Sequence, residues 1–225
     1  MPRTVTITKT LYKFDELPTE RAKEKARDWY RQIQDVHLVL LDLNIDDFRQ
    51  IAAIFGIEFA QREVQSARTG KKWYEYQIYY TGFSCQGDGA CFDGSYTYAA
   101  DAPKKIREYA PQDSELQRIA DDLEALQSRN AFQLIATCKQ SGRYYHAYSM
   151  GVDVSRADDD SENEPAPISA EDEKELRELL RDFANWIYRT LEKDYEYQTS
   201  NEAIDESLTA NEYEFTEDGK RDNGN

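Results

Sequence analysis

The sequence predicts an α+β fold, in which a mostly antiparallel, tyrosine-rich sheet is covered by helices. Segments with apolar residues at every third or fourth position stand towards both ends of the chain, which is typical of amphipathic helices. Segments of alternating β-branched and aromatic residues fill much of the middle, which is typical of half-buried strands. A mostly antiparallel sheet that is covered by helices belongs to the α+β class.

The amino-terminal part is predicted to hold one strand and two helices. Thr4–Lys9 alternates β-branched residues and predicts a strand. A helix follows Pro18, because proline is tolerated in a first turn and apolar residues then recur at helical spacing. A second helix is predicted over Val36–Phe55, and Gly56 is placed to end it.

The middle of the chain is predicted to supply the sheet. Ile57–Val64 and Trp73–Tyr80 predict two strands around a polar turn, and a third strand should run through Phe92, Tyr96 and Tyr98. Two helices should follow, opened by Pro103 and capped by Asp113. The last two predicted strands, 131–139 and 144–154, flank a turn and form a hairpin.

The carboxyl-terminal third begins with an acidic segment at residues 157–167, which predicts a solvated linker. Ser169-Ala-Glu-Asp172 is a capping box that starts the longest predicted helix. A short helix near Asn201–Leu208 and a strand at Tyr213–Thr216 should complete the fold. We therefore predict a single domain over residues 1–219 and a frayed tail at 220–225.

Charge is distributed very unevenly along the chain, whose net charge is −16. Residues 151–225 hold 23 acidic and 8 basic residues, a net of −15, whereas residues 1–150 hold 21 and 20, a net of −1. Such a surface repels nucleic-acid phosphates and attracts basic protein surfaces. The charge pattern therefore predicts a basic protein partner and no direct binding of nucleic acid.

The location predicted from the sequence is the cytoplasm. No apolar run approaches the length needed to cross a bilayer, and the first residues lack an apolar signal core. Three cysteines without a Cys-x-x-Cys pair favour reduced thiols over a disulfide framework. Cys85 and Cys91 also lack the paired spacings of a structural zinc site, so we expect no metal and no cofactor.

The least ordinary stretch is the glycine-rich loop Gly82–Tyr96, GFSCQGDGACFDGSY, which holds four of the ten glycines and two of the three cysteines. One interpretation is a sharp connection between strands, with positive φ at the glycines and with Gln86 and Asp88 bonded to the loop backbone. Another is a ligand site, in which loop amides hold a phosphate beside tyrosines. Its candidate residues are Gln86, Gly87, Asp88, Gly89, Tyr144 and His146, with Tyr74, Tyr76 and Tyr148 as further walls of the cleft.

Within this loop, Asp88-Gly-Ala-Cys91-Phe92 resembles the cysteine box of ovarian-tumour-type deubiquitinases. The resemblance implies a thiol hydrolase with Cys91 as nucleophile and His146 as base. In that family the cysteine opens a helix, which lowers its pKa. Here the residues after Cys91 predict a strand, and His146 lies in a strand-like run of tyrosines, so a hydrogen-bonded sheet histidine is the competing interpretation.

A broader resemblance runs over nearly the whole chain. TLYKFDELPTERAKEKARDWYR, SCQGDGACFDGSY, IREYAPQDSEL, SGRYYHAYSMGVDV and the segment Thr209–Gly219 resemble a family of acidic, mostly uncharacterised proteins encoded by phages and prophages, some of them labelled antitoxin-like. The resemblance implies a phage accessory protein acting in a bacterial cytoplasm. It supplies no catalytic residues.

Charge and resemblance together predict a non-enzymatic phage protein that binds and inhibits a host protein, in an anti-defence role. Its acidic surface would mimic nucleic acid or act as an antitoxin-like inhibitor does. The carboxylates expected to contact the partner lie on the longest helix and before it: Asp158, Asp159, Asp160, Glu171, Asp172, Glu175, Glu178 and Asp182. The alternatives left open are a nucleotide-binding or ligand-sequestering protein, and a hydrolase using Cys91 and His146.

Overall fold

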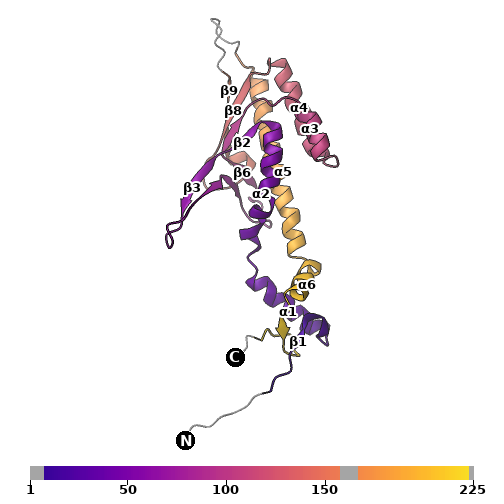
Figure 1. The fold of residues 1–225 in the computed structure, drawn as a ribbon. Helices are drawn as coiled ribbons and strands as arrows, with labels where there is room; N and C mark the ends of the chain where they lie inside the picture. Colours follow the sequence, from indigo (N-terminus) through magenta and orange to yellow (C-terminus); the bar gives the residue numbers. More distant parts are fainter. Residues whose placement is uncertain (1–7, 158–166, 223–225) are drawn as a thin grey trace. The chain divides into compact units, whose positions relative to one another are not determined.

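The computed structural model describes residues 8–157 and 167–222, and the chain divides into two compact units. Unit 1 comprises residues 1–43 and 193–225, and unit 2 comprises residues 44–192. Helices and antiparallel sheets confirm the α+β class (Figure 1). Most of the strand predicted at Thr4–Lys9 and most of the acidic segment at 157–167 lie outside the described residues. The single domain over 1–219 stays a prediction.

Unit 1 is built from both ends of the chain. The helix α1 (Glu20–Ile33) begins after Thr19, whose side chain accepts the Ala22 amide at 3.2 Å. The short strands β1 (Tyr12–Lys13) and β10 (Glu214–Phe215) pair antiparallel. With the 3₁₀ turn η1 (Phe14–Glu16) and the helix α6 (Asn201–Ala210), these elements enclose a small apolar core of Phe14, Leu17, Ala22, Ala26, Ile204, Leu208 and Phe215.

Arg27 is the one charged side chain buried in this unit's described part, at 7% exposure. A buried cation is stable only when it is paired. Its guanidinium donates two hydrogen bonds to Asp205, at 2.7 and 2.8 Å, and further bonds reach Glu20 and Glu24 at 2.5 and 3.0 Å. The pair with Asp205 joins residues 178 positions apart, so it holds α1 against α6.

Unit 2 is organised by a four-stranded antiparallel sheet in the order β2–β7–β8–β9. Its strands are β2 (Ile57–Phe59), β7 (Gly94–Tyr96), β8 (Leu134–Gln140) and β9 (Met150–Arg156). The same unit contains the helices α3 (Ala102–Tyr109) and α4 (Ser114–Arg129) and most of α5 (Ala170–Gln198). Asp113 caps α4 as predicted, because its carboxylate accepts the amides of Glu115 and Leu116.

The helices α2 (Val36–Phe55) and α5 each bury apolar residues at the three- and four-residue spacing of an amphipathic helix. On α5 the stripe residues Leu176, Leu179, Leu180, Phe183, Ile187 and Leu191 are all buried. Phe183 meets Phe55 edge-on, with ring centroids 5.3 Å apart, and lies stacked with Phe59 at 6.3 Å. Gly56 ends α2 with φ of +82°, as predicted.

Three predicted strands are each split in two, which corrects the prediction of continuous strands. Ala60, Gln77 and Asp93 stand at the three breaks, and their backbones bond in a ring: Ala60 N to Asp93 O, Asp93 N to Gln77 O, and Gln77 N to Ala60 O, at 2.8 to 2.9 Å. The segments on either side enter different sheets. β3 (Gln61–Gln65) pairs with β4 (Lys72–Tyr76), and β5 (Ile78–Tyr80) pairs with β6 (Ala90–Phe92).

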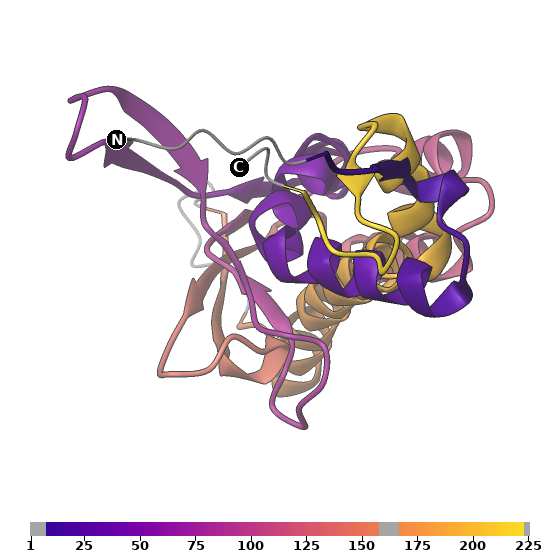
Figure 2. The ribbon, with the colours of Figure 1, turned by 90° about the horizontal axis from the view of Figure 1, so that it is seen from below.

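The β3–β4 arm, residues Gln61–Tyr76, extends away from the rest of unit 2 in both views (Figures 1 and 2). Its two strands pair with each other, and the turn at 66–71 closes its far end. Most of its side chains are exposed. A two-stranded ribbon that no other layer covers is marginally stable by itself in water, so the arm depends on the unit that carries it.

Candidate functional site

The glycine-rich loop does not place Cys91 as a nucleophile requires. Cys91 lies in β6, paired with Tyr79, and is 1% exposed. The residues directly after it form strands and not a helix, so no helix dipole stabilises a thiolate there. Burial, and after it the charge of Asp93, raise the pKa of the Cys91 thiol to about 12. The side chain therefore stays a neutral thiol at physiological pH and is part of the core.

His146 is not a sheet histidine, which corrects that interpretation. It precedes the 3₁₀ turn η2 (Ala147–Ser149), because β9 starts later than predicted. Its Nδ1 accepts the Tyr148 amide at 3.1 Å, and its own amide donates to Ser149 Oγ at 3.1 Å. The ring stacks on Tyr148 with centroids 5.5 Å apart. The imidazole is thus used to cap a turn, and the Nδ1 lone pair is occupied.

The remaining loop residues bond mainly to the loop itself. The Asp88 carboxylate accepts the amides of Ser84 and Cys85, at 2.9 and 2.7 Å, and these bonds lower the pKa of Asp88. Gly82, Gly87, Gly89 and Gly94 do not have the positive φ expected of them. Close packing explains two of them instead: a Cβ on Gly89 would lie 2.7 Å from the His146 ring, and one on Gly94 would lie 2.3 Å from Glu58 O.

The other residues proposed for the ligand site differ in their accessibility. The Asp88 carboxylate is occupied by hydrogen bonds to amides of its own loop, and the His146 ring packs against Gly89. Gln86 and Gly87 are exposed at the loop tip, and Tyr144 is 62% exposed on the segment before η2.

Four of the eight carboxylates predicted to contact a partner form ion pairs inside unit 2. Asp172 and Glu175 both pair with Arg129, Asp182 pairs with Arg118 at 2.6 Å, and Glu178 pairs with Arg181 at 2.9 Å. Within the described chain Glu171 alone of the five on α5 is exposed without an ion pair. Asp158, Asp159 and Asp160 lie outside the described residues.

A different set of acids is exposed in the carboxyl-terminal part of unit 1. Its members lie at the end of α5, on α6 and around β10, and none forms an ion pair with any residue that the structure describes: Glu196, Glu202, Glu206, Glu214 and Glu217. Glu202 and Glu206 are four positions apart on α6, so they occupy the same stripe of that helix. We call this set the unit 1 carboxylates.

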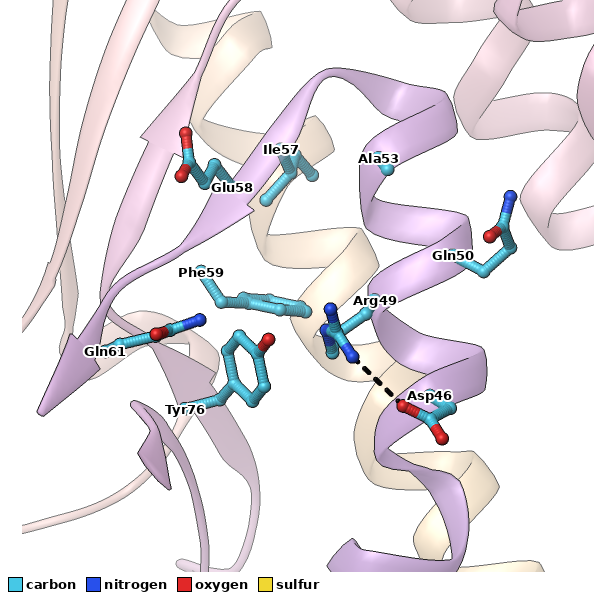
Figure 3. A pocket seen from close by; sticks show the side chains of 9 residues that line it. All are labelled: Asp46, Arg49, Gln50, Ala53, Ile57, Glu58, Phe59, Gln61 and Tyr76. Atoms are coloured by element: carbon cyan, nitrogen blue, oxygen red, sulfur yellow. Dashed lines mark hydrogen bonds and ion pairs between the residues drawn. The ribbon is translucent and has the colours of Figure 1, made fainter. Parts of the chain in front are cut away.

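Unit 2 also has a cavity of about 510 Å³ between α2 and the base of the β3–β4 arm (Figure 3). The Arg49 guanidinium lies over the Tyr76 ring, 4.7 Å from its centroid, and pairs with Asp46 at 3.0 Å. The lining is completed by Gln50, Ala53, Ile57, Glu58, Phe59 and Gln61. Tyr76 was among the predicted cleft residues, but Arg49 was not, because it belongs to a separate element and does not break the pattern of its helix.

Neither a metal site nor a membrane span was found in the part of the chain that the structure describes. Among these residues no three His, Cys, Asp or Glu side chains are grouped as metal ligands would be. The helices there all lack a stretch both long and apolar enough to cross a membrane.

Comparison with known families identifies one match. The model of a domain of unknown function, DUF8835, matches residues 40–201. The chain belongs to this family. No curated protein and no solved structure matches this chain.

The DUF8835 match covers the whole of unit 2, including the cavity, the glycine-rich loop and the β3–β4 arm. The unit 1 carboxylates Glu202, Glu206, Glu214 and Glu217 lie beyond its end. Any property that depends on these four residues therefore lies outside the matched range, whereas the cavity and the arm lie within it.

Proposed function

We propose that this DUF8835 protein is a non-enzymatic accessory protein of a phage, which binds and inhibits a basic host protein. The whole-chain resemblance to phage-encoded acidic proteins supports the setting, and a net charge of −16 supports a basic partner. An antitoxin-like role belongs to the same class, because an antitoxin also acts by binding. Against a thiol hydrolase stand the burial of Cys91 and the raised pKa of its thiol.

One observation carries the proposal: the unit 1 carboxylates are exposed and make no ion pair with the described chain. When an acid pairs with an arginine, the two charges largely cancel, and the pair attracts a basic partner only weakly. An unpaired exposed acid attracts cations within about a Debye length, roughly 8 Å at physiological salt. The contact is therefore expected at the unit 1 carboxylates and no longer at Asp172, Glu175, Glu178 and Asp182.

The test compares a variant that lacks three of the unit 1 carboxylate charges with a control variant that lacks three acidic charges elsewhere. In the first variant Glu202, Glu206 and Glu217 become Gln. In the control Glu58 and Glu108 become Gln and Asp153 becomes Asn, which removes the same charge from exposed, unpaired acids of unit 2. Host proteins captured by the full chain are identified, and the affinity of the purified partner is measured at several salt concentrations.

We expect a partner with a basic surface, bound more weakly as salt rises, and an affinity lowered about tenfold or more in the first variant. The control should retain most of the affinity. Equal losses in both variants, or binding indifferent to salt, would exclude docking through the unit 1 carboxylates.

The cavity beside Arg49 favours a second candidate function, the binding of a small planar ligand such as a nucleotide. Its volume suits one small molecule, and stacked Arg and Tyr side chains offer both a flat face and hydrogen-bond donors. Titration calorimetry with mononucleotides and cyclic dinucleotides tests this candidate. Binding should be lost in Arg49→Gln and kept in Lys139→Gln, and an absence of heat with every nucleotide would exclude it.

A further inference from the structure

The β3–β4 arm is a basic element in an acidic protein. It holds four cationic residues, Arg62, Arg68, Lys71 and Lys72, and two acidic ones, Glu63 and Glu75. Its formal charge is therefore +2, within a chain of net charge −16. This local reversal of sign is not explained by the proposed contact with a basic protein.

The charges are arranged so that the free cations stand at the far end. Along the ribbon, Arg62 pairs with Glu75 at 3.5 Å and Lys72 pairs with Glu63 at 2.7 Å. Arg68 and Lys71 lie in the turn, are exposed, and make no ion pair with any described residue. The arm thus has two uncompensated cations at its tip, and two further cations along its strands whose charge is compensated by glutamates.

Two large aromatic side chains are exposed directly behind this tip. Trp73 is 40% exposed and Tyr74 is 65% exposed, on a ribbon with no second layer over either face. Neighbouring residues of a strand point to opposite faces, so each face of the arm carries one ring. Exposed rings beside uncompensated cations are the combination that binds a nucleic-acid strand, because rings stack on bases and cations hold phosphates.

We infer that the β3–β4 arm binds nucleic acid, with Arg68 and Lys71 on phosphates and Trp73 or Tyr74 against bases. A two-stranded ribbon also fits the width of a DNA major groove, so both a duplex and a single strand are compatible with its dimensions. The inference does not depend on the proposed host protein, because it uses a different surface in the other unit.

The net charge of −16 does not prevent this contact. Each strand of the arm has five residues, which extends it by about 17 Å at roughly 3.3 Å per residue. That length is about two Debye lengths at physiological salt, where the Debye length is roughly 8 Å. The potential at the tip is therefore set mainly by the arm's own charges. The exclusion of nucleic acid predicted from the net charge applies to the remaining surface.

The test measures binding of the full chain to a fluorescently labelled 20-nucleotide single strand and to the corresponding duplex, by anisotropy at several salt concentrations. The test variant is Arg68→Gln with Lys71→Gln. The matched control, Lys104→Gln with Lys139→Gln, removes the same charge from two exposed lysines elsewhere in unit 2. A second variant, Trp73→Ser with Tyr74→Ser, removes the rings without changing charge.

We expect the logarithm of the association constant to fall linearly with the logarithm of the salt concentration, with a slope between about −2 and −4 for the duplex. The tip variant should lose about tenfold or more in affinity at low salt, and its slope should shrink by about 1.4 to 1.8. The ring variant should weaken single-strand binding with little change in slope. Tighter binding of one form identifies which nucleic acid the arm takes.

Three results would overturn the inference. One is the absence of binding to either DNA at low salt. Another is an equal loss of affinity in the tip variant and the lysine control. The third is full competition by polyglutamate at the same charge concentration, which would assign the arm to acidic protein surfaces instead.

Discussion

At the scale of residues, the two cysteines of the glycine-rich loop differ in the access that solvent has to them. Cys85 is exposed near the loop tip, whereas Cys91 is buried in β6 and Cys138 is buried in β8. Burial raises the pKa of both buried thiols to about 12. Since the thiolate is the reactive form, the loop's motif-like cysteine should be the inert one and its neighbour the reactive one.

Alkylation tests this order directly. At pH 8 a thiol with a pKa of about 12 is ionised in roughly one molecule in ten thousand. In the native protein, iodoacetamide should therefore modify Cys85 and leave Cys91 and Cys138 intact, and all three should react in urea. Peptide mass spectrometry over a time course gives the three rates. Native Cys91 reacting as fast as Cys85 would contradict the burial and reopen the hydrolase hypothesis.

At the scale of elements, the feature that shapes unit 2 is the ring of backbone hydrogen bonds through Ala60, Gln77 and Asp93. Each of three chain segments passes from one sheet into another at this point. Gly94 follows Asp93 directly, and because it has no side chain the Glu58 carbonyl can pack against its backbone. A Cβ at this position would lie only 2.3 Å from the Glu58 carbonyl oxygen. The pairing of β2 with β7 therefore depends on glycine at this position.

Gly94→Ala should destabilise the protein, because the methyl group meets backbone that cannot rotate away. The expected loss is about 2 to 4 kcal/mol in the free energy of unfolding. Gly87→Ala is the matched control, since a Cβ there meets nothing within 4 Å and should change stability by less than about 0.5 kcal/mol. Urea unfolding followed by circular dichroism compares the two, and similar midpoints would show that β2 and β7 are not packed this closely.

At the scale of the whole molecule, folding redistributes the charge that is uneven along the chain. Unit 1 holds 17 acidic and 11 basic residues, a net of −6, and unit 2 holds 27 and 17, a net of −10. Bases from the first part of the chain pair with acids from the last, as in Lys25 with Asp218, Lys9 with Asp222 and Arg118 with Asp182. The carboxylates left unpaired are therefore better markers of a docking surface than the net charge of a segment.

Ion pairs of carboxylates with Lys and Arg should make the folded protein less stable at acidic pH. Lys25 lowers the pKa of Asp218, Arg27 lowers that of Glu24, and Arg129 lowers that of Asp172. A carboxyl group whose pKa is lower in the folded state stabilises the fold above its unfolded pKa, near 4, and this contribution is lost as pH falls through the folded value.

The midpoint of urea unfolding should therefore be level between pH 6 and 7 and fall steadily from about pH 5 to pH 2.5. Because salt screens exposed pairs, the fall should be smaller in 1 M NaCl. A midpoint that rises on acidification at low salt would mean that relief of acidic self-repulsion outweighs the loss of these pairs.

Several elements could be predicted from the sequence because their signals are local. The helix over Val36–Phe55 has the predicted bounds, and Asp113 and Ser169 lie at the starts of α4 and α5, where their side chains accept amides of the first turn. An apolar period of 3.6 and a capping side chain are properties of neighbouring residues, which the sequence displays directly. Much less of the candidate site was predictable, since the Arg49 and Tyr76 of the cavity meet only in the folded unit.

By itself the sequence determined the α+β class, most helices and the net charge, because each follows from composition or from contacts within a few positions. The tertiary structure alone decided where the strands split, that Cys91 is buried, and which acids remain unpaired. These outcomes depend on residues far apart in the chain, such as Arg129 with Asp172 or Gly94 with Glu58, and no local pattern encodes such a meeting.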